Sequence, residues 1–339
     1  MPNKRVTSIY VASEAGVSPK TVSRVLNDEP FVSEANRQRV KAVAARLNYH
    51  PNINAQGLIS KRSYLIGLTY EKPSPSYVVE LQKGALERLE NERYRLIVLP
   101  YSNASAYPEG IVPLIRSAGL DGVILPPPAC DLKVVLDGLD SVGIPYARVS
   151  PCKYKQRGPQ AMMDDIAAAR EIAAYMVGLG HRKFGIIMGD VTHNSSTARS
   201  KGYIEAFTQA GLREQDMKWV DGDFTLSSGI EAASKLLDSP NRPTAILAQN
   251  DDMAAGALIA ARERNIHVPN QLSITGFDDS EISRLAWPPI TTVYQPVQEM
   301  ARDAADQLLQ CIEGTPHAER RHHTHRFLVR GSTAPPMAE

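Results

Sequence analysis

Cysteine is scarce in this sequence of 339 residues, and aromatic side chains make up only 6% of it. The three cysteines, Cys130, Cys152 and Cys311, lie far apart without Cys-x-x-Cys spacing, which argues against a disulfide framework and a zinc site. We expect partly buried free thiols. No apolar run approaches the roughly 20 residues of a membrane-spanning helix. The polar, basic start lacks the apolar stretch of a signal peptide, so the expected location is cytoplasmic.

Common catalytic signatures are also missing. The sequence contains no GxxxxGK[ST], GxSxG or HExxH motif, and no GxGxxG follows a predicted strand. His322, His323 and His325 come nearest to a metal cluster, but no acid or cysteine accompanies them at standard spacing. We expect these to be surface histidines, and we predict no catalytic residues, no metal site and no cofactor.

Charge is divided unevenly along the chain. The net charge is +1, yet residues 1–63 contain ten Lys and Arg against four acidic residues. The remainder therefore carries an excess of five acidic residues. A basic head on a mildly acidic body is typical of a domain that binds a polyanion, joined to one that does not. A merely solvated charged face is the alternative.

The basic head predicts a helix-turn-helix. Thr7 or Ser8 can cap a first helix, and Gly16 can supply the backbone freedom for a tight turn. Ser18 is a plausible cap for a second helix with Pro19 at its first position, where a missing N–H costs nothing. With a turn of about four residues, this second helix would enter the major groove of DNA.

A third helix is expected to begin at a Ser33 cap and to close a small core. The predicted core residues are Val40, Val43, Ala44, Leu47, Ile9, Val11, Ala12, Ala15, Val22 and Val25. The predicted outward side chains of the second helix are Pro19, Lys20, Thr21, Ser23 and Arg24, a mixture of base-reading and phosphate-binding types.

Three segments carry a family resemblance: AGVSPKTVSRVLN at 15–27, LNYHPN at 47–52 and AQGL at 55–58. They resemble the DNA-binding head and hinge of the LacI/GalR family of bacterial transcriptional regulators. The resemblance implies that Pro19 and Lys20 select the operator and that Arg24 reads a base. The implied DNA-binding set is Ser18, Pro19, Lys20, Thr21, Ser23, Arg24, Asn27, Tyr49, Asn52, Ala55 and Leu58.

The segment 51–63 is weakly structured on its own, because it is short and contains Gly57. The resemblance implies a hinge helix that folds only when two copies meet in the operator's minor groove, with Leu58 as an apolar wedge. An ordinary linker, in which Leu58 packs on the next domain, is the alternative.

The body alternates strand and helix patterns. Strands are predicted at 64–70, 95–99, 122–125, 145–149, 184–188, 244–248, 272–277 and 326–329, and helices at 78–93, 167–179, 228–237, 253–264 and 297–312. This rhythm predicts parallel sheets covered on both faces, with ligands bound beyond the carboxyl ends of the strands.

The predicted fold class is a small all-α helix-turn-helix head plus an α/β effector domain made of two doubly wound parallel-sheet subdomains. The architecture of this effector domain resembles that of periplasmic sugar-binding proteins, so the domain is expected to be periplasmic-binding-protein-like. The predicted domains are 1–50 for the head, 51–63 for the hinge and 64–339 for ligand sensing. Within the ligand-sensing domain, the N-subdomain is predicted to cover about 64–163 and 294–325, and the C-subdomain about 164–293 and 326–334.

The resemblance also implies a ligand site in the cleft between the subdomains. Arg199 in RSKGY matches the effector-binding arginine, Asp278 in GFDD the cleft aspartate, and Asn250 in QNDDM a cleft amide. Phe224 matches an aromatic position that can stack on a sugar ring. The loop 71–77 and the segment 294–297 should also reach the cleft. The predicted ligand-binding set is Tyr77, Arg199, Phe224, Asn250, Asp278 and Gln295.

Structural alternatives stay open for these residues. Arg199 and Asp278 could form an interdomain ion pair. Asn250 could cap the helix that begins at Asp251, and Phe224 could belong to the core.

The sequence thus predicts a homodimeric DNA-binding transcriptional regulator, expected to be a repressor, that binds palindromic operator DNA. A small-molecule effector, expected to be a sugar or sugar derivative, would control its affinity allosterically, whether by releasing DNA or by promoting its binding. The absence of a heptad tail predicts no tetramer. The alternative is a sugar-binding or catalytic α/β protein that uses the same cleft.

Overall fold

The computed structural model describes residues 6–26, 29–49, 62–71, 74–102, 106–315 and 320–337. The chain divides into two compact units, a head at residues 1–64 and a body at residues 65–339. The predicted hinge at 51–63 lies almost wholly outside the described residues, and the finer domain limits stay predictions.

Three short helices form the head: α1 (Ser8–Ala15), α2 (Pro19–Leu26) and α3 (Glu34–Arg46). The Thr7 hydroxyl caps α1 by accepting the N–H of Tyr10 at 3.3 Å, and Gly16 ends this helix at φ 63°. The Ser18 hydroxyl accepts the N–H of Thr21 at 3.1 Å at the start of α2. The predicted helix-turn-helix is confirmed, including Pro19 as the first residue of its second helix.

The head core contains nine of the ten residues that were predicted for it. Seven are buried, and Val43 and Leu47 pack against them partly exposed. The prediction was wrong for Ile9, whose exposed fraction is 69%. Because each helical residue turns about 100°, Ile9 lies roughly 200° from Val11 and points away from the face that Val11, Ala12 and Ala15 bury.

The first sheet of the body has six parallel strands in the order β11-β5-β4-β3-β1-β2. Both central strands, β3 and β4, are buried at every position, as expected when helices cover both faces of a parallel sheet. The strands are β1 (Leu65–Tyr70), β2 (Arg95–Pro100), β3 (Gly122–Leu125), β4 (Tyr146–Val149), β5 (Gln160–Met162) and β11 (Arg320–His322).

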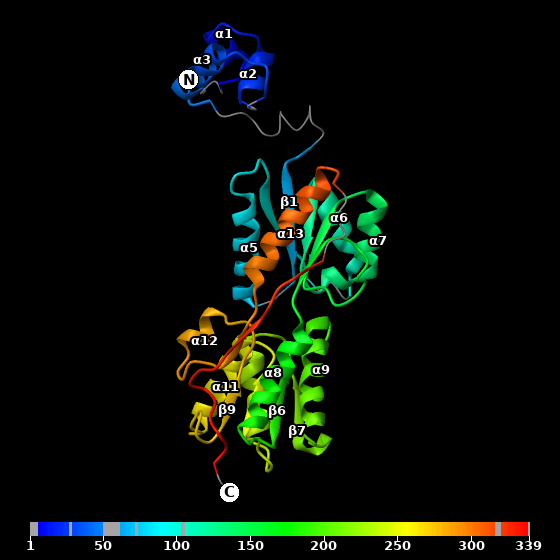
Figure 1. The fold of residues 1–339 in the computed structure, drawn as a ribbon, viewed down its shortest axis with the longest axis vertical. Helices are drawn as coiled ribbons and strands as arrows, with labels where there is room; N and C mark the ends of the chain where they lie inside the picture. Colours follow the sequence, from blue (N-terminus) through cyan, green and yellow to red (C-terminus); the bar gives the residue numbers. More distant parts are fainter. Residues whose placement is uncertain are drawn as a thin grey trace. The chain divides into compact units, whose positions relative to one another are not determined.

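Helices α5 (Pro75–Leu89) and α13 (Val297–Ile312) pack together on one face of this sheet, and α6 (Ile111–Ser117) and α7 (Lys133–Val142) lie on the other (Figure 1). At Gly84 of α5, an added Cβ would lie 2.0 Å from the carbonyl oxygen of Gln298 on α13. Glycine therefore permits the close approach of α5 and α13. Short 3-10 turns, η1 (Pro108–Gly110) and η2 (Ala129–Asp131), precede α6 and α7.

The second sheet has four parallel strands in the order β7-β6-β8-β9. Helices α8 and α9 pack against each other (Figure 1). Helix α10 packs against α11. The elements are α8 (Asp165–Gly178), β6 (Phe184–Met188), α9 (Asn194–Gln209), η3 (Glu214–Asp216), β7 (Met217–Asp221), α10 (Leu226–Leu237), β8 (Ala245–Ala248), α11 (Asp251–Glu263), β9 (Ser273–Thr275) and α12 (Glu281–Leu285).

Two segments near the end of the body differ from the prediction. The predicted strand at 326–329 joins neither parallel sheet: β12 (Arg326–Leu328) pairs antiparallel with β10 (Thr292–Tyr294). Strands β5, β7, β10 and β11 were not predicted. Three of them are only three residues long, and β7 is a half-buried edge strand without a continuous apolar run.

Candidate functional sites

All six residues of the predicted ligand set line one cavity of about 40 Å³ in the body. Five other residues complete the lining: Ser74, Pro127, Ser150, His193 and Ser195. Several lining residues directly follow parallel strands, from β3 and β4 in the first sheet and from β8 in the second. The cavity therefore lies beyond the carboxyl ends of strands of both sheets, where open α/β folds bind ligands.

Arg199 of α9 is the most heavily bonded side chain of the cavity. Its Nε donates to Asp165 at 2.9 Å, one Nη donates to the Gln249 carbonyl, and the other donates to Gln295 at 3.2 Å and lies 3.7 Å from Asp278. Burial disfavours the charged guanidinium, but Asp165 and Asp278 raise the pKa of Arg199 above its ordinary value.

Arg199 and Asp278 therefore form the ion pair that was the structural alternative for these residues, but the pair is not an interdomain one. Both residues belong to the half of the body built on the second sheet, so the pair does not join the two halves. Asp165, at the start of α8, is the closer partner of Arg199.

Asp278 and Phe224 have unusual backbones. Their φ angles are 116° and 68°, a region that residues with a side chain rarely adopt. Such strain tends to gather at ligand sites, where the surrounding structure holds it in place. Burial raises the pKa of the Asp278 carboxyl well above its usual range, although Arg199 opposes the shift.

Asn250 caps α11, which was the structural alternative for this residue. Its Oδ1 accepts the N–H of Met253 at 2.9 Å, and its Nδ2 donates to the carbonyl of Phe224 at 2.9 Å. The Asn250 side chain therefore holds Phe224 at the cavity wall. Phe224 in turn belongs both to the lining and to the hydrophobic core.

The sequence predicted that Tyr77 is the last residue of a loop at 71–77. That prediction was wrong. It lies in the first turn of α5, because the helix begins at Pro75 rather than at residue 78. Proline at the first helical position explains the earlier start.

His193 and Ser74 were missed from the sequence. The ring of His193 lies 5.4 Å from that of Phe224, and burial lowers the pKa of His193. The Ser74 hydroxyl is buried beside the Asp252 carboxyl, and its hydrogen bond to Asp252 partly offsets the rise that burial causes in the pKa of Asp252. The only sequence signal for His193 was its place in the loop between a predicted strand and Arg199.

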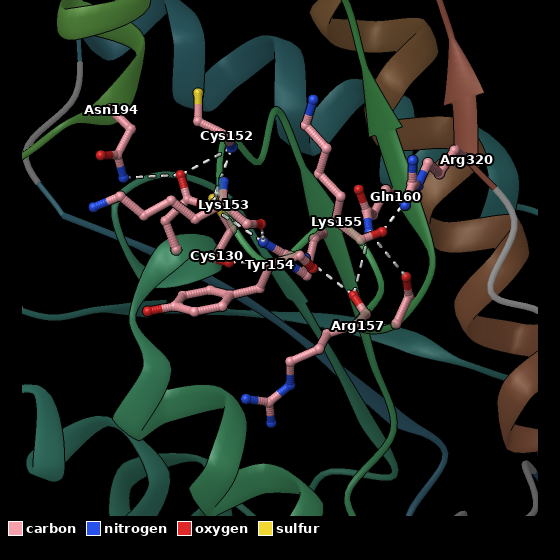
Figure 2. A network of polar contacts seen from close by, with 12 residues as sticks. Cys130, Cys152, Lys153, Tyr154, Lys155, Arg157, Gln160, Asn194 and Arg320 are labelled. Atoms are coloured by element: carbon pink, nitrogen blue, oxygen red, sulfur yellow. Dashed lines mark hydrogen bonds and ion pairs between the residues drawn. The ribbon is translucent and has the colours of Figure 1, made fainter.

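Arg148 is fully buried, and its backbone partners Cys130, Tyr154 and Arg157 are labelled in Figure 2. Arg148 of β4 donates to the carbonyls of Cys130 at 2.7 Å, Tyr154 at 2.8 Å and Arg157 at 3.0 Å, and to the Asp131 carboxylate at 3.1 Å. These bonds fold the chain after β4 back against the loop after β3.

Asp131 extends this network to the other half of the body. Its carboxylate accepts the N–H groups of Cys152 at 3.0 Å and Lys153 at 2.9 Å, and also the side-chain amide of Asn194 at 3.0 Å (Figure 2). Because Asn194 is the first residue of α9, this hydrogen bond joins the two halves beside the cavity.

In the head, Pro19, Lys20 and Arg24 of α2 are exposed, whereas Thr21 and Ser23 are half-buried. Arg24 lies 3.6 Å from Glu29. Tyr49 packs against the head core. Four predicted DNA-binding residues, Asn27, Asn52, Ala55 and Leu58, lie outside the described residues.

Cys130 is buried, and Cys152 and Cys311 are partly buried, as predicted. No group of His, Cys, Asp and Glu in the described part of the chain could hold a metal ion. His322 is exposed, while His323 lies 3.2 Å from Asp303 and His325 lies 2.9 Å from Glu171. Each of the two half-buried histidines thus faces a carboxylate.

Comparison with known proteins identifies both units. Residues 10–52 match the family described as bacterial regulatory proteins, lacI family, and residues 173–333 match a periplasmic binding protein-like domain. The HTH-type transcriptional regulator DegA of Bacillus subtilis (strain 168) is 35% identical over 300 residues, which cover 88% of this chain and 89% of DegA. The chain belongs to the LacI family. The predicted family and fold class are thereby confirmed.

Solved structures of LacI-family proteins match nearly the whole chain. The lac repressor dimer bound to operator and the anti-inducer ONPF is 27% identical, with a TM-score of 0.85 and coverage of 98% of this chain and 100% of that one. The transcriptional regulator CelR in complex with cellobiose is 28% identical, with a TM-score of 0.72 and coverage of 97% and 100%. No helix within the described residues of this LacI-family chain has the length and apolar character that a bilayer crossing requires.

Proposed function

We propose that this chain is a transcriptional repressor that binds a palindromic operator as a homodimer and whose affinity for DNA is set by a small effector in the body cavity. The convergence of six residues, chosen from the sequence, on one cavity at the strand ends carries the effector part of the proposal. The exposed Lys20 and Arg24 on the second helix of a helix-turn-helix support the operator part. Ligand closure of the cavity would act on DNA through the hinge at 51–63.

Because operator DNA lies in the cytoplasm of a bacterium, we propose that the protein acts there. We also propose that it is not an enzyme. The charged side chains of the cavity are engaged with one another rather than arranged as a nucleophile with its base.

Dimerisation would use an apolar groove along α11 and α12. Trp287 is 90% exposed, Leu285 is 75% exposed, and both line this groove together with Ile259. Leu285 also borders a second hollow with Val79, which is an exposed residue of α5. Side chains of this kind are the usual anchors of interfaces, and a two-fold operator requires two copies of the chain.

The operator part is tested by Arg24→Ala. We expect a loss of about 1–3 kcal/mol in operator binding and relaxed specificity at one position of each half-site, because a base contact is removed. The measurement is a titration of a panel of operator variants at fixed salt. Arg46→Ala is the matched control, since Arg46 is an exposed arginine of α3. If the variant lost the same binding free energy on every operator sequence, Arg24 would contact only a phosphate and not a base.

The effector part is tested by Asp278→Ala. We expect effector binding to weaken by about 1.5–3 kcal/mol, the value of a hydrogen bond to a charged group, while operator affinity without effector stays nearly unchanged. Operator and effector are titrated separately. Asp221→Ala, at an exposed strand end, is the control and should change neither. If Asp278→Ala lost operator affinity but kept its effector affinity, Asp278 would have a structural role and not a role in effector binding.

A further inference from the structure

A carboxylate lies beside Arg24, the arginine of α2 that is expected to read a base. Glu29 comes three residues after the end of α2, and its Oε2 is 3.6 Å from the Nε of Arg24. The two side chains are 44% and 47% exposed. An ion pair this exposed contributes little to the stability of the fold. Its consequence therefore concerns the orientation of the Arg24 guanidinium rather than folding.

The backbone of Glu29 is fixed from both sides. Its N–H donates to the carbonyl of Arg24 at 2.9 Å, and its own carbonyl accepts from an Nη of Arg37 at 2.9 Å. The first bond joins a residue to the carbonyl five positions earlier, as at helix ends of the Schellman type. Arg37 belongs to α3, and its side chain is only 20% exposed. Glu29 thus has a defined place relative to both α2 and α3.

The Glu29 carboxylate faces the side of the guanidinium that base reading does not need. It lies on the Nε side, so it does not occupy the edge formed by the two Nη groups of Arg24. That edge can donate to O6 and N7 of guanine together, which is the commonest specific contact in the major groove. A long side chain loses rotamer freedom when it binds, and a contact that already restricts it lowers that cost.

The same carboxylate has an opposite effect on DNA binding in general. Non-specific affinity comes from the neutralisation of phosphates, which an added negative charge in the head opposes on every sequence. The gain from an oriented Arg24, in contrast, arises only where a guanine meets it. Both effects of Glu29 therefore raise the ratio of specific to non-specific affinity.

We propose that Glu29 is a positioning residue for operator recognition, which orients Arg24 for a two-bond contact with a guanine in each half-site. This inference rests on the proposed function, since it requires Arg24 to read a base. It adds to the predicted DNA-binding set a residue that acts through Arg24.

Glu29→Gln in the full-length chain is the test. The unchanged protein first selects duplexes from a pool of random sequence, and Arg24→Ala identifies the base position that Arg24 reads in the selected duplex. That duplex, its three single-base variants at this position and a random-sequence duplex are then titrated at one salt concentration. We expect Glu29→Gln to lower the preference for guanine about threefold. We expect it to raise the affinity for the random-sequence duplex about twofold, because a negative charge is lost.

Two further variants separate geometry from charge. Glu29→Asp keeps the charge but shortens the side chain by one methylene, so we expect the same loss of guanine preference without the gain on random-sequence DNA. Glu14→Gln removes a charge from another ion pair of the head, in which Glu14 lies 2.6 Å from Arg46. Neither of these two residues is in the predicted DNA-binding set, and the guanine preference should stay unchanged.

The outcomes distinguish this inference from the proposed function. If Arg24→Ala relaxes the preference at one position and Glu29→Gln does not, operator reading by Arg24 stands and the inference is wrong. An affinity gain of Glu29→Gln on every duplex with an unchanged preference would mean that the ion pair breaks on DNA. An equal loss on every duplex would show only damage to the head, and it would also overturn the inference. If Arg24→Ala itself loses equally on all duplexes, the base contact and the inference are both wrong.

Discussion

Arg148→Ala is expected to lower the free energy of unfolding of the body by about 3–5 kcal/mol, because it leaves the buried Asp131 carboxylate without its cation. It also removes the donor that holds four backbone carbonyls after β3 and β4, those of Cys130, Lys153, Tyr154 and Arg157. Denaturant unfolding followed by tryptophan fluorescence measures the loss.

Arg157→Ala is the matched control for this change. Arg157 lies in the same loop and pairs with Asp137 at 2.6 Å and with Asp140, but these carboxylates are exposed. Solvent screens such pairs, so we expect a loss below about 1 kcal/mol. Equal losses in the two variants would show that burial of the Arg148 network contributes nothing beyond surface ion pairing.

Trp287→Asp is expected to dissociate the dimer. Removal of an interface anchor costs about 2 kcal/mol or more, and two-fold symmetry places the change twice in the interface. The dimer dissociation constant should therefore rise by about three orders of magnitude. Sedimentation equilibrium checks the dimer, and operator titration at nanomolar protein checks the accompanying loss of DNA affinity.

Val191→Asp serves as its control, because Val191 is a 72% exposed apolar residue that does not line the groove. We expect that variant to remain dimeric. A dimeric Trp287→Asp protein would place the dimer interface on another surface.

The sequence alone determined the parts of this protein that depend on local interactions. The caps at Thr7 and Ser18 and the turn at Gly16 lie within a few residues of the groups they bond, so their residue types predicted the helix-turn-helix. Apolar runs likewise predicted the buried strands β3 and β8. The family resemblance named six residues that share a cavity, although their roles in binding stay predictions.

Only the tertiary structure decided which of these residues contact one another. Arg199 bonds Asp165, 34 positions away, and Gln295, 96 positions away. Asp131 accepts a hydrogen bond from Asn194, which is 63 positions away in the sequence. The residues next to Arg148 and His193 in the sequence form no motif that would have predicted a role for either side chain. Such pairs depend on the order of the strands and on the packing of the helices, which no local pattern encodes. The hydrogen bonds around Arg199 follow from that packing rather than from the sequence motifs.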